Sequence, residues 1–95
     1  MTEKTEHQTS AQLLQQGLFH HRQGQVGLAM ERYTEVPKND PNNGEALYYV
    51  AVVCCQDGQY KQGAELARKA IAAGLNTAKV HNLLGQALDL LVEPL

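Results

Sequence analysis

Two stretches of the 95-residue chain decide its fold: LLQQGLFHHRQGQVGLA at residues 13–29 and LYYVAVVCCQDGQYKQG at residues 47–63. They lie 34 residues apart, and in each a helix-forming segment leads to a Gly-Gln pair and then to a second helix-forming segment. Gly17 aligns with Ala51, and the same step reaches Gly85, so small residues recur at one position. Self-similarity at a fixed period indicates a repeat architecture in which neighbouring units bury a shared core.

Apolar residues recur at helical spacing from Ser10 onwards, and no stretch alternates with period two, so we predict an all-α chain without strands. Five helices are expected, at residues 10–22, 26–36, from after 42 or 43 to 56, 60–73 and 78–91. Pro37 is expected to end the second helix, because proline cannot donate to the helix hydrogen-bond ladder. Gly74 stands where a left-handed glycine commonly caps a helix.

Two of the helix starts have the spacing of a capping box, Thr9 with Gln12 and Asn42 with Glu45. In such a box the first side chain accepts a hydrogen bond from the backbone N–H three residues later. Small residues are expected to let paired helices approach closely, at positions 17, 29, 51, 63 and 85.

The period also divides the chain into segments. Residues 1–9 are polar and lack apolar periodicity, so they are expected to form a disordered leader. The segments that follow are a first unit at 10–43, a second unit at 44–77, and at 78–95 the first helix of an incomplete third unit or a capping helix. A single helical hairpin cannot bury its own apolar face, so the units are expected to stack.

A helix–turn–helix repeat of this length resembles the tetratricopeptide repeat (TPR) family. The resemblance covers residues 10–95 and rests on Leu13, Gly17, His20, Ala29, Tyr33, Pro41, Leu47, Val50, Ala51, Cys54, Gly63, Ala67, Ala70, His81, Leu84, Gly85 and Leu88. The chain departs from the family pattern at Gln16, where leucine is usual, and at Leu75, where proline is usual. The resemblance implies antiparallel helix–turn–helix repeats stacked as a right-handed superhelical solenoid of five helices.

In TPR proteins the first helix of each unit lines a concave groove that binds a peptide or a partner helix. The resemblance therefore implies a protein–protein interaction module that is not an enzyme and needs no cofactor. The implied partner-binding residues are Leu14, Leu18, Arg22, Tyr48, Tyr49, Val52, Gln56, Lys79, Asn82 and Gln86. Tyr48 and Tyr49 are the expected anchors, because aromatic side chains combine a large contact area with a polar tip. The alternative is that one of these tyrosines packs between the units.

Two other functions stay open. The truncated third unit is compatible with the N-terminal or internal TPR arm of a larger enzyme, such as an O-GlcNAc-transferase-like glycosyltransferase. The leucines that crowd residues 78–91 are compatible with a self-assembling unit, and Leu84, Leu88 and Leu91 are the expected contacts of a homodimer. A chaperone carboxylate clamp is not indicated, because only Lys79 matches the residues that such a clamp needs.

The histidines and cysteines do not indicate a catalytic or metal site. Neighbouring residues on a helix point about 100° apart, so His20 and His21 do not form a ligand pair. His20 and Cys54 occupy the same position of the repeat, where packing is the expected role. No histidine, cysteine or carboxylate has the spacing of a metal site.

Charge and hydropathy exclude further classes. A formal net charge of −2 and the lack of a basic cluster argue against nucleic-acid binding. No apolar run approaches the ~20 residues needed to span a bilayer, and the polar start argues against a secretory signal. Cys54 and Cys55 are adjacent and cannot bridge each other within a helix. These features favour a reducing, cytoplasmic location.

Overall fold

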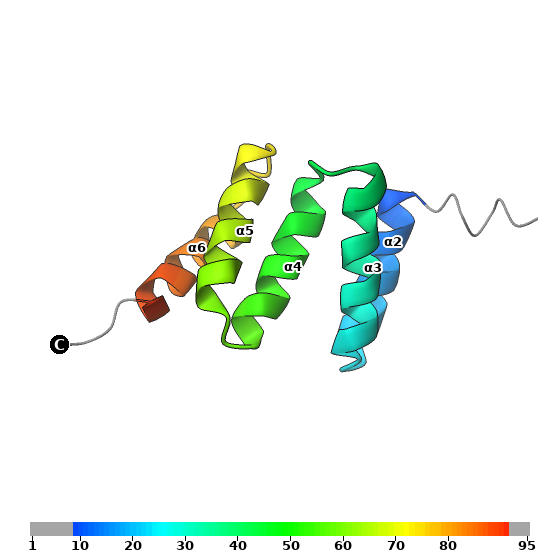
Figure 1. Cartoon of the computed structure of the whole chain (residues 1–95), viewed down its shortest axis with the longest axis horizontal. Helices are drawn as coiled ribbons and strands as arrows, with labels where there is room; N and C mark the ends of the chain where they lie inside the picture. Colours follow the sequence, from blue (N-terminus) through cyan, green and yellow to red (C-terminus); the bar gives the residue numbers. More distant parts are fainter. Residues whose placement is uncertain (1–8, 92–95) are drawn as a thin grey trace, which may run out of the picture. The chain divides into compact units, whose positions relative to one another are not determined.

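The computed structural model describes residues 9–91, and this part of the chain contains five α-helices and no strand. The helices are α2 (Ser10–Arg22), α3 (Val26–Asn39), α4 (Gly44–Gln56), α5 (Tyr60–Ala72) and α6 (Ala78–Leu91) (Figure 1). The predicted all-α fold is therefore confirmed. The expected leader falls outside the described residues except for Thr9, and so does the end of the expected third segment.

The helix boundaries repeat with the period of the sequence. α2, α4 and α6 begin at Ser10, Gly44 and Ala78, which are 34 residues apart in each step. α3 and α5 begin at Val26 and Tyr60, which are separated by the same interval. The described residues thus form a helical repeat, as the sequence predicted; the right-handed superhelix implied by the TPR resemblance stays a prediction.

The turns between helices repeat as well. Gly24 and Gly58 have φ angles of 78° and 82°, in the left-handed region that glycine enters without steric cost. The N–H of Gln25 donates to the carbonyl of His20 at 2.8 Å, and the same bond recurs 34 residues later, also at 2.8 Å. This arrangement is a Schellman motif, which closes one helix while it directs the chain into the next. Gly74 has a φ of 107°, so its predicted left-handed conformation is confirmed.

The chain divides into two compact units between Pro41 and Asn42. In the first unit α2 packs against α3. Tyr33 of α3 is fully buried and lies against Gly17 of α2, where an added Cβ would come within 2.6 Å of the tyrosine Cδ1. Ala29 is also fully buried. The predicted close approach of the paired helices is confirmed in this unit.

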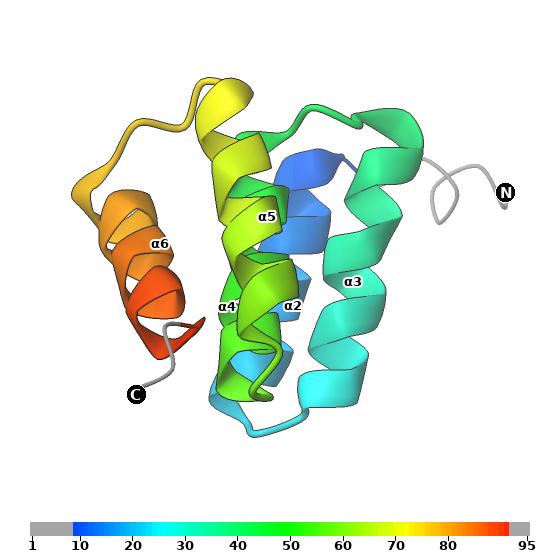
Figure 2. The same cartoon turned by 60° about the vertical axis from the view of Figure 1, so that its left-hand side comes forward.

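In the second unit α5 packs against both α4 and α6 (Figure 2). The core consists of Ala51, Ala67, Ala70 and Val80, all with 0% of their surface exposed. Because most of these side chains are methyl groups, the helix backbones approach closely. Gly85 behaves differently from the prediction: it is exposed, and apart from its own stretch of helix no atom of the described residues lies within 4 Å of a Cβ built on it.

The end of α3 corrects one expectation. The helix continues past Pro37 to Asn39, so the predicted end at residue 36 is wrong. Pro37 lies in the last turn, where it removes only one hydrogen bond from the ladder. The fully buried Val36 anchors this turn, and its carbonyl accepts from the N–H of Asp40 at 2.8 Å. The hydroxyl of Ser10 donates to Asp40 Oδ2 at 3.3 Å and ties the end of α3 to the start of α2.

The helix starts confirm one predicted cap and correct the other. At α2, the N–H of Gln12 donates to Thr9 Oγ1 at 3.1 Å and the N–H of Thr9 donates to Gln12 Oε1 at 2.9 Å. The box expected at Asn42 is wrong, because α4 begins one residue later than that box requires. Asn43 is the cap instead, and its Oδ1 accepts from the N–H of Ala46 at 3.0 Å.

We expect Asn43→Ala to lower the free energy of unfolding by about 1 kcal/mol, because a backbone N–H at the start of α4 loses its acceptor. Asn42→Ala is the matched control and should change stability by less than about 0.5 kcal/mol. Urea unfolding followed by circular dichroism measures both. Equal effects of the two substitutions would contradict the assignment of the cap to Asn43.

Candidate functional site

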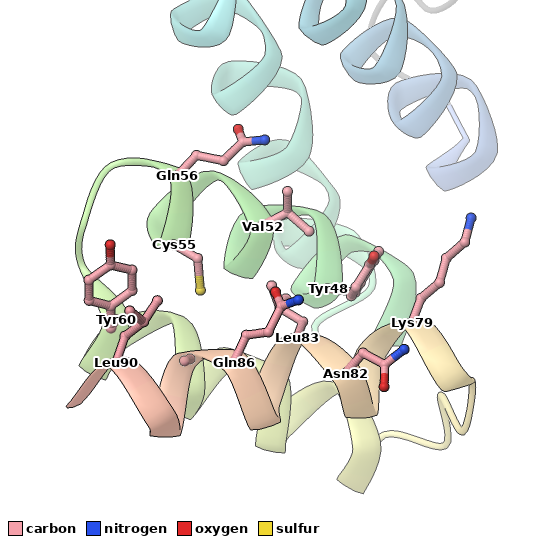
Figure 3. A pocket seen from close by; sticks show the side chains of 11 residues that line it. Tyr48, Val52, Cys55, Gln56, Tyr60, Lys79, Asn82, Leu83, Gln86 and Leu90 are labelled. Atoms are coloured by element: carbon pink, nitrogen blue, oxygen red, sulfur yellow. The ribbon is translucent and has the colours of Figure 1, made fainter. Parts of the chain in front are cut away.

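A pocket of about 460 Å³ opens on the second unit between α4 and α6, with a contribution from the first residue of α5 (Figure 3). Its lining residues are Tyr48, Val52, Cys55, Gln56, Tyr60, Lys79, Asn82, Leu83, Gln86, Ala87 and Leu90. All of them belong to the second unit, so the pocket is a feature of one compact body.

Helical spacing brings the apolar side chains of the pocket together. Tyr48, Val52 and Cys55 follow one another at about one turn along α4, so they share a face. Leu83 and Leu90 lie two turns apart on α6 and line the other wall. Tyr48 and Leu83 also pack against the alanine-rich core, which holds the two walls at their separation.

The rim of the pocket is polar. Gln56, Asn82 and Gln86 carry amide side chains on exposed residues. An amide both donates and accepts, so these groups can bond to the backbone of a bound chain. Lys79 is also exposed and is the one charged residue among the described residues that line the pocket. The lining therefore carries a positive charge and favours an acidic group in a ligand.

The two adjacent tyrosines differ in their placement. Their ring centroids are 5.3 Å apart, and the ring planes are inclined by 57°. Both tyrosines are half-buried, but Tyr48 lines the pocket and Tyr49 does not line it. The difference follows from the angle of about 100° between neighbouring side chains on a helix. Tyr48 is therefore the aromatic anchor that this pocket offers.

The two cysteines are free thiols, with Cys54 buried and Cys55 half-buried. Cys55 Sγ lies against Gly63 of α5, and a Cβ on residue 63 would clash with this sulfur. Burial raises the pKa of the Cys55 thiol. Burial is also the main cause that raises the pKa of Cys54, with smaller contributions from Cys55 and Asp57. A raised pKa lowers the population of thiolate, which is the form that attacks substrates or binds metals.

The structure gathers six of the predicted partner-binding residues in this pocket: Tyr48, Val52, Gln56, Lys79, Asn82 and Gln86. The other five lining residues are outside that predicted set: Cys55, Tyr60, Leu83, Ala87 and Leu90. Tyr60 begins a second helix, so a prediction confined to the first helix of each unit omits it. Leu83 and Leu90 are seven residues apart, so they lie on one face of the helix, and Leu83 follows the predicted residue Asn82 directly. This spacing was a usable signal that both line the pocket.

The remaining predicted contacts lie elsewhere. Leu14, Leu18 and Arg22 belong to the first unit and do not line the pocket. Leu14 is only 6% exposed, so it offers little surface to a partner. Leu18 is half-buried and Arg22 is exposed.

The first unit has a smaller pocket of about 330 Å³, lined by Gln12, Gln15, Gln16, Phe19 and His20. The ring of His20 packs edge-on against Phe19 with centroids 5.5 Å apart. His20 Nδ1 also lies 2.8 Å from Gln25 Oε1, next to the turn that follows α2. These contacts explain a structural role for His20, and its pocket lacks the aliphatic walls of the larger one.

The described part of the chain also lacks the features of a metal site and of a membrane span. Within residues 9–91, no group of three or more histidine, cysteine, aspartate or glutamate side chains is placed to hold a metal ion. None of the helices in this range combines the length and apolar character needed to cross a membrane. Neither the protein-family models nor the curated proteins contain a match to this chain.

Proposed function

We propose that this chain is a non-catalytic protein–protein interaction module of the TPR type, and that the pocket between α4 and α6 binds a segment of a partner protein. The observation that carries this proposal is the apolar pocket beside Tyr48, rimmed by three amides and Lys79. The recurrence of helix starts and Schellman turns every 34 residues supports the TPR resemblance.

The size and lining of the pocket define its ligand. A volume of about 460 Å³ is sufficient for one or two apolar side chains. Leu90 is 58% exposed, and covering it with a ligand would remove apolar surface from water. We expect a segment with an apolar anchor, an acidic residue near Lys79, and a backbone that the amides can bond.

The thiols support a role without catalysis, because burial raises the pKa of Cys54 and Cys55 and so disfavours the reactive thiolate. We also propose a cytoplasmic location. The two cysteines are free, which suits a reducing compartment.

Selection from a random peptide display library on the whole chain provides a ligand for the test. A selected peptide is then titrated into isotope-labelled protein and followed by NMR. We expect the largest shift changes at the residues of α4 and α6 that line the pocket. Shift changes confined to other parts of the chain would contradict the proposed site.

Leu90→Glu is expected to raise the Kd of the selected peptide by about tenfold or more, because it places a carboxylate where the ligand needs an apolar surface. Its exposure means that the fold should be unaffected. Leu28→Glu is the matched control, since Leu28 is a 40% exposed leucine of α3 outside the pocket. Calorimetric titration measures the Kd, and equal values for the two variants would reject the pocket as the binding site.

A further inference from the structure

The face of α6 that carries Gly85 is open. In the first unit the corresponding residue, Gly17, lies against Tyr33 of the second helix. In the second unit the corresponding residue, Ala51, lies in the core with Ala67 of the second helix. Among the described residues, none covers Gly85 within 4 Å of its added Cβ. The face of α6 around Gly85 corresponds to the face of α2 that packs against α3 and to the face of α4 that packs against α5. On α6 this face is exposed.

This open face is apolar along one side. Leu84 and Leu88 are half-buried, and Leu91 is 41% exposed. Helical spacing places Leu88 next to Gly85 and away from Lys79 and Gln86. Leu84 also packs against the core of its own unit, and Leu91 borders the start of α5, so each offers only its outer part to a partner. A partner that covered this side would gain apolar contacts without entering the pocket.

A polar ridge runs along the other side of the same face. His81, Gly85 and Asp89 follow one another at intervals of four residues, so they form one ridge of the helix surface. His81 and Asp89 are both exposed. The His81 ring is held near the start of α6, where its Nε2 lies 2.7 Å from Asn76 Oδ1. The ridge thus has an imidazole at one end, a carboxylate at the other and a glycine at its centre.

The order of these groups is self-complementary. When two such helices cross antiparallel with Gly85 facing Gly85, His81 of each copy lies opposite Asp89 of the other. With Nε2 facing Asn76 Oδ1, the Nδ1 of each imidazole is the ring nitrogen left to contact the carboxylate of the other copy. Two glycines at the crossing point let the backbones approach closely, and a two-fold interface requires this kind of self-matching surface.

We propose that the ridge surface, formed by His81, Leu84, Gly85, Leu88, Asp89 and Leu91, binds a second copy of this chain. The two α6 helices pack antiparallel about a two-fold axis at Gly85. Leu88 and the outer parts of Leu84 and Leu91 in each copy are covered by the other copy, and two His81–Asp89 contacts fix the register. The pocket lies on a different side of α6, so the dimer and the proposed partner binding are separate properties.

Sedimentation equilibrium of the whole chain over a range of concentrations tests the dimer. We expect a reversible monomer–dimer equilibrium. Gly85→Leu should raise the dimer Kd by at least about tenfold, which corresponds to about 1.4 kcal/mol. The monomer has space for this side chain, because nothing lies within 4 Å of the position. Gly27→Leu is the matched control, since Gly27 is another exposed helical glycine with open space around it, and it should leave the Kd unchanged.

A charge exchange tests the antiparallel register. Asp89→Lys should weaken the dimer, because it removes both carboxylates that face His81. Adding His81→Asp to that variant should restore the Kd to within about threefold of the original value, since a carboxylate and an ammonium group then face each other at both ends. A chain that stays monomeric at all concentrations overturns the proposal. A dimer that is insensitive to Gly85→Leu, or one that the double exchange fails to restore, overturns it as well.

Discussion

Gly17→Ala is expected to lower the free energy of unfolding by about 2–3 kcal/mol. Alanine is the better helix former by about 1 kcal/mol, so propensity alone predicts the opposite sign. The steric term dominates, because the new Cβ would lie within 2.6 Å of Tyr33 Cδ1. Tyr33 is fully buried, so its ring has no solvent-filled space into which it can turn. Either α2 and α3 separate or the ring leaves its preferred rotamer, and each costs packing energy.

Gly27→Ala is the matched control for this prediction. Gly27 belongs to α3 in the same unit, and a Cβ there would meet nothing within 4 Å. We expect this substitution to stabilise the protein by about 0.4–1 kcal/mol, because it reduces the conformational freedom of the unfolded chain. Urea unfolding of both variants should therefore give shifts of opposite sign.

The steric origin can be tested by a double-mutant cycle. Gly17→Ala should cost less in a Tyr33→Leu background, because leucine lacks the ring atoms that the new Cβ would meet. We expect a coupling energy of at least about 1 kcal/mol between the two substitutions. Additive effects would show that the cost arises from something other than the contact between α2 and the tyrosine ring.

The features that the sequence predicted well depend on residues close together in the chain. The Gly24 and Gly58 turns are formed by hydrogen bonds within a few residues, so a Gly-Gln pair suffices to indicate them. The helix starts at Ser10, Gly44 and Ala78 follow from the same local period. The close helix approach at Gly17 was also predicted from the recurrence of small residues, although the same rule failed at Gly85.

The features that the sequence did not predict depend on distant contacts or on small differences between neighbours. α3 continues beyond Pro37 with its end held by the bond between Ser10 and Asp40, which are 30 residues apart. Asn42 and Asn43 have the same capping chemistry, and only the actual start of α4 distinguishes them. Propensity cannot rank two identical side chains at adjacent positions.

The candidate site was likewise predicted only in part. The helix faces that carry Tyr48, Val52 and Asn82 follow from periodicity, and these residues do line the pocket. Periodicity does not reveal whether a face is covered, so the burial of Leu14 was not predicted. Nor does it reveal that Tyr60 reaches the pocket from another helix, because that depends on how closely α4 and α5 pack.

Val80→Asp is expected to lower the free energy of unfolding by about 3–5 kcal/mol. Val80 is fully buried and packs with Ala51, Ala67 and Ala70. Among the described residues no polar or charged side chain is buried, so a carboxylate at this position would lack a partner. A folded chain of this length is stable by only about 5–15 kcal/mol, so the loss is a large fraction of the total.

The effect should depend on pH with a defined sign. Burial would raise the pKa of the introduced carboxyl in the folded state above its value in the unfolded chain. The deficit in stability should therefore shrink as the pH falls from the raised pKa of the folded state towards about 4, and it should level off below that, where the carboxyl is protonated in both states. Val80→Asn has nearly the same shape without the ionisable group, so its deficit relative to the original chain should not show this change. A pH-independent deficit for Val80→Asp would contradict the burial of a charge as its cause.

A matched control separates the buried position from the chemistry of the substitution. Val26→Asp makes the same change at an exposed residue that begins α3, where the helix dipole favours a carboxylate, so it should change stability by less than about 0.5 kcal/mol. Val80 holds α6 against α5, and α6 supplies both one wall of the pocket and the whole ridge surface. Val80→Asp should therefore abolish peptide binding and dimer formation together, whereas Leu90→Glu affects the first and Gly85→Leu the second. A Val80→Asp chain that retained both would show that neither surface depends on the docking of α6.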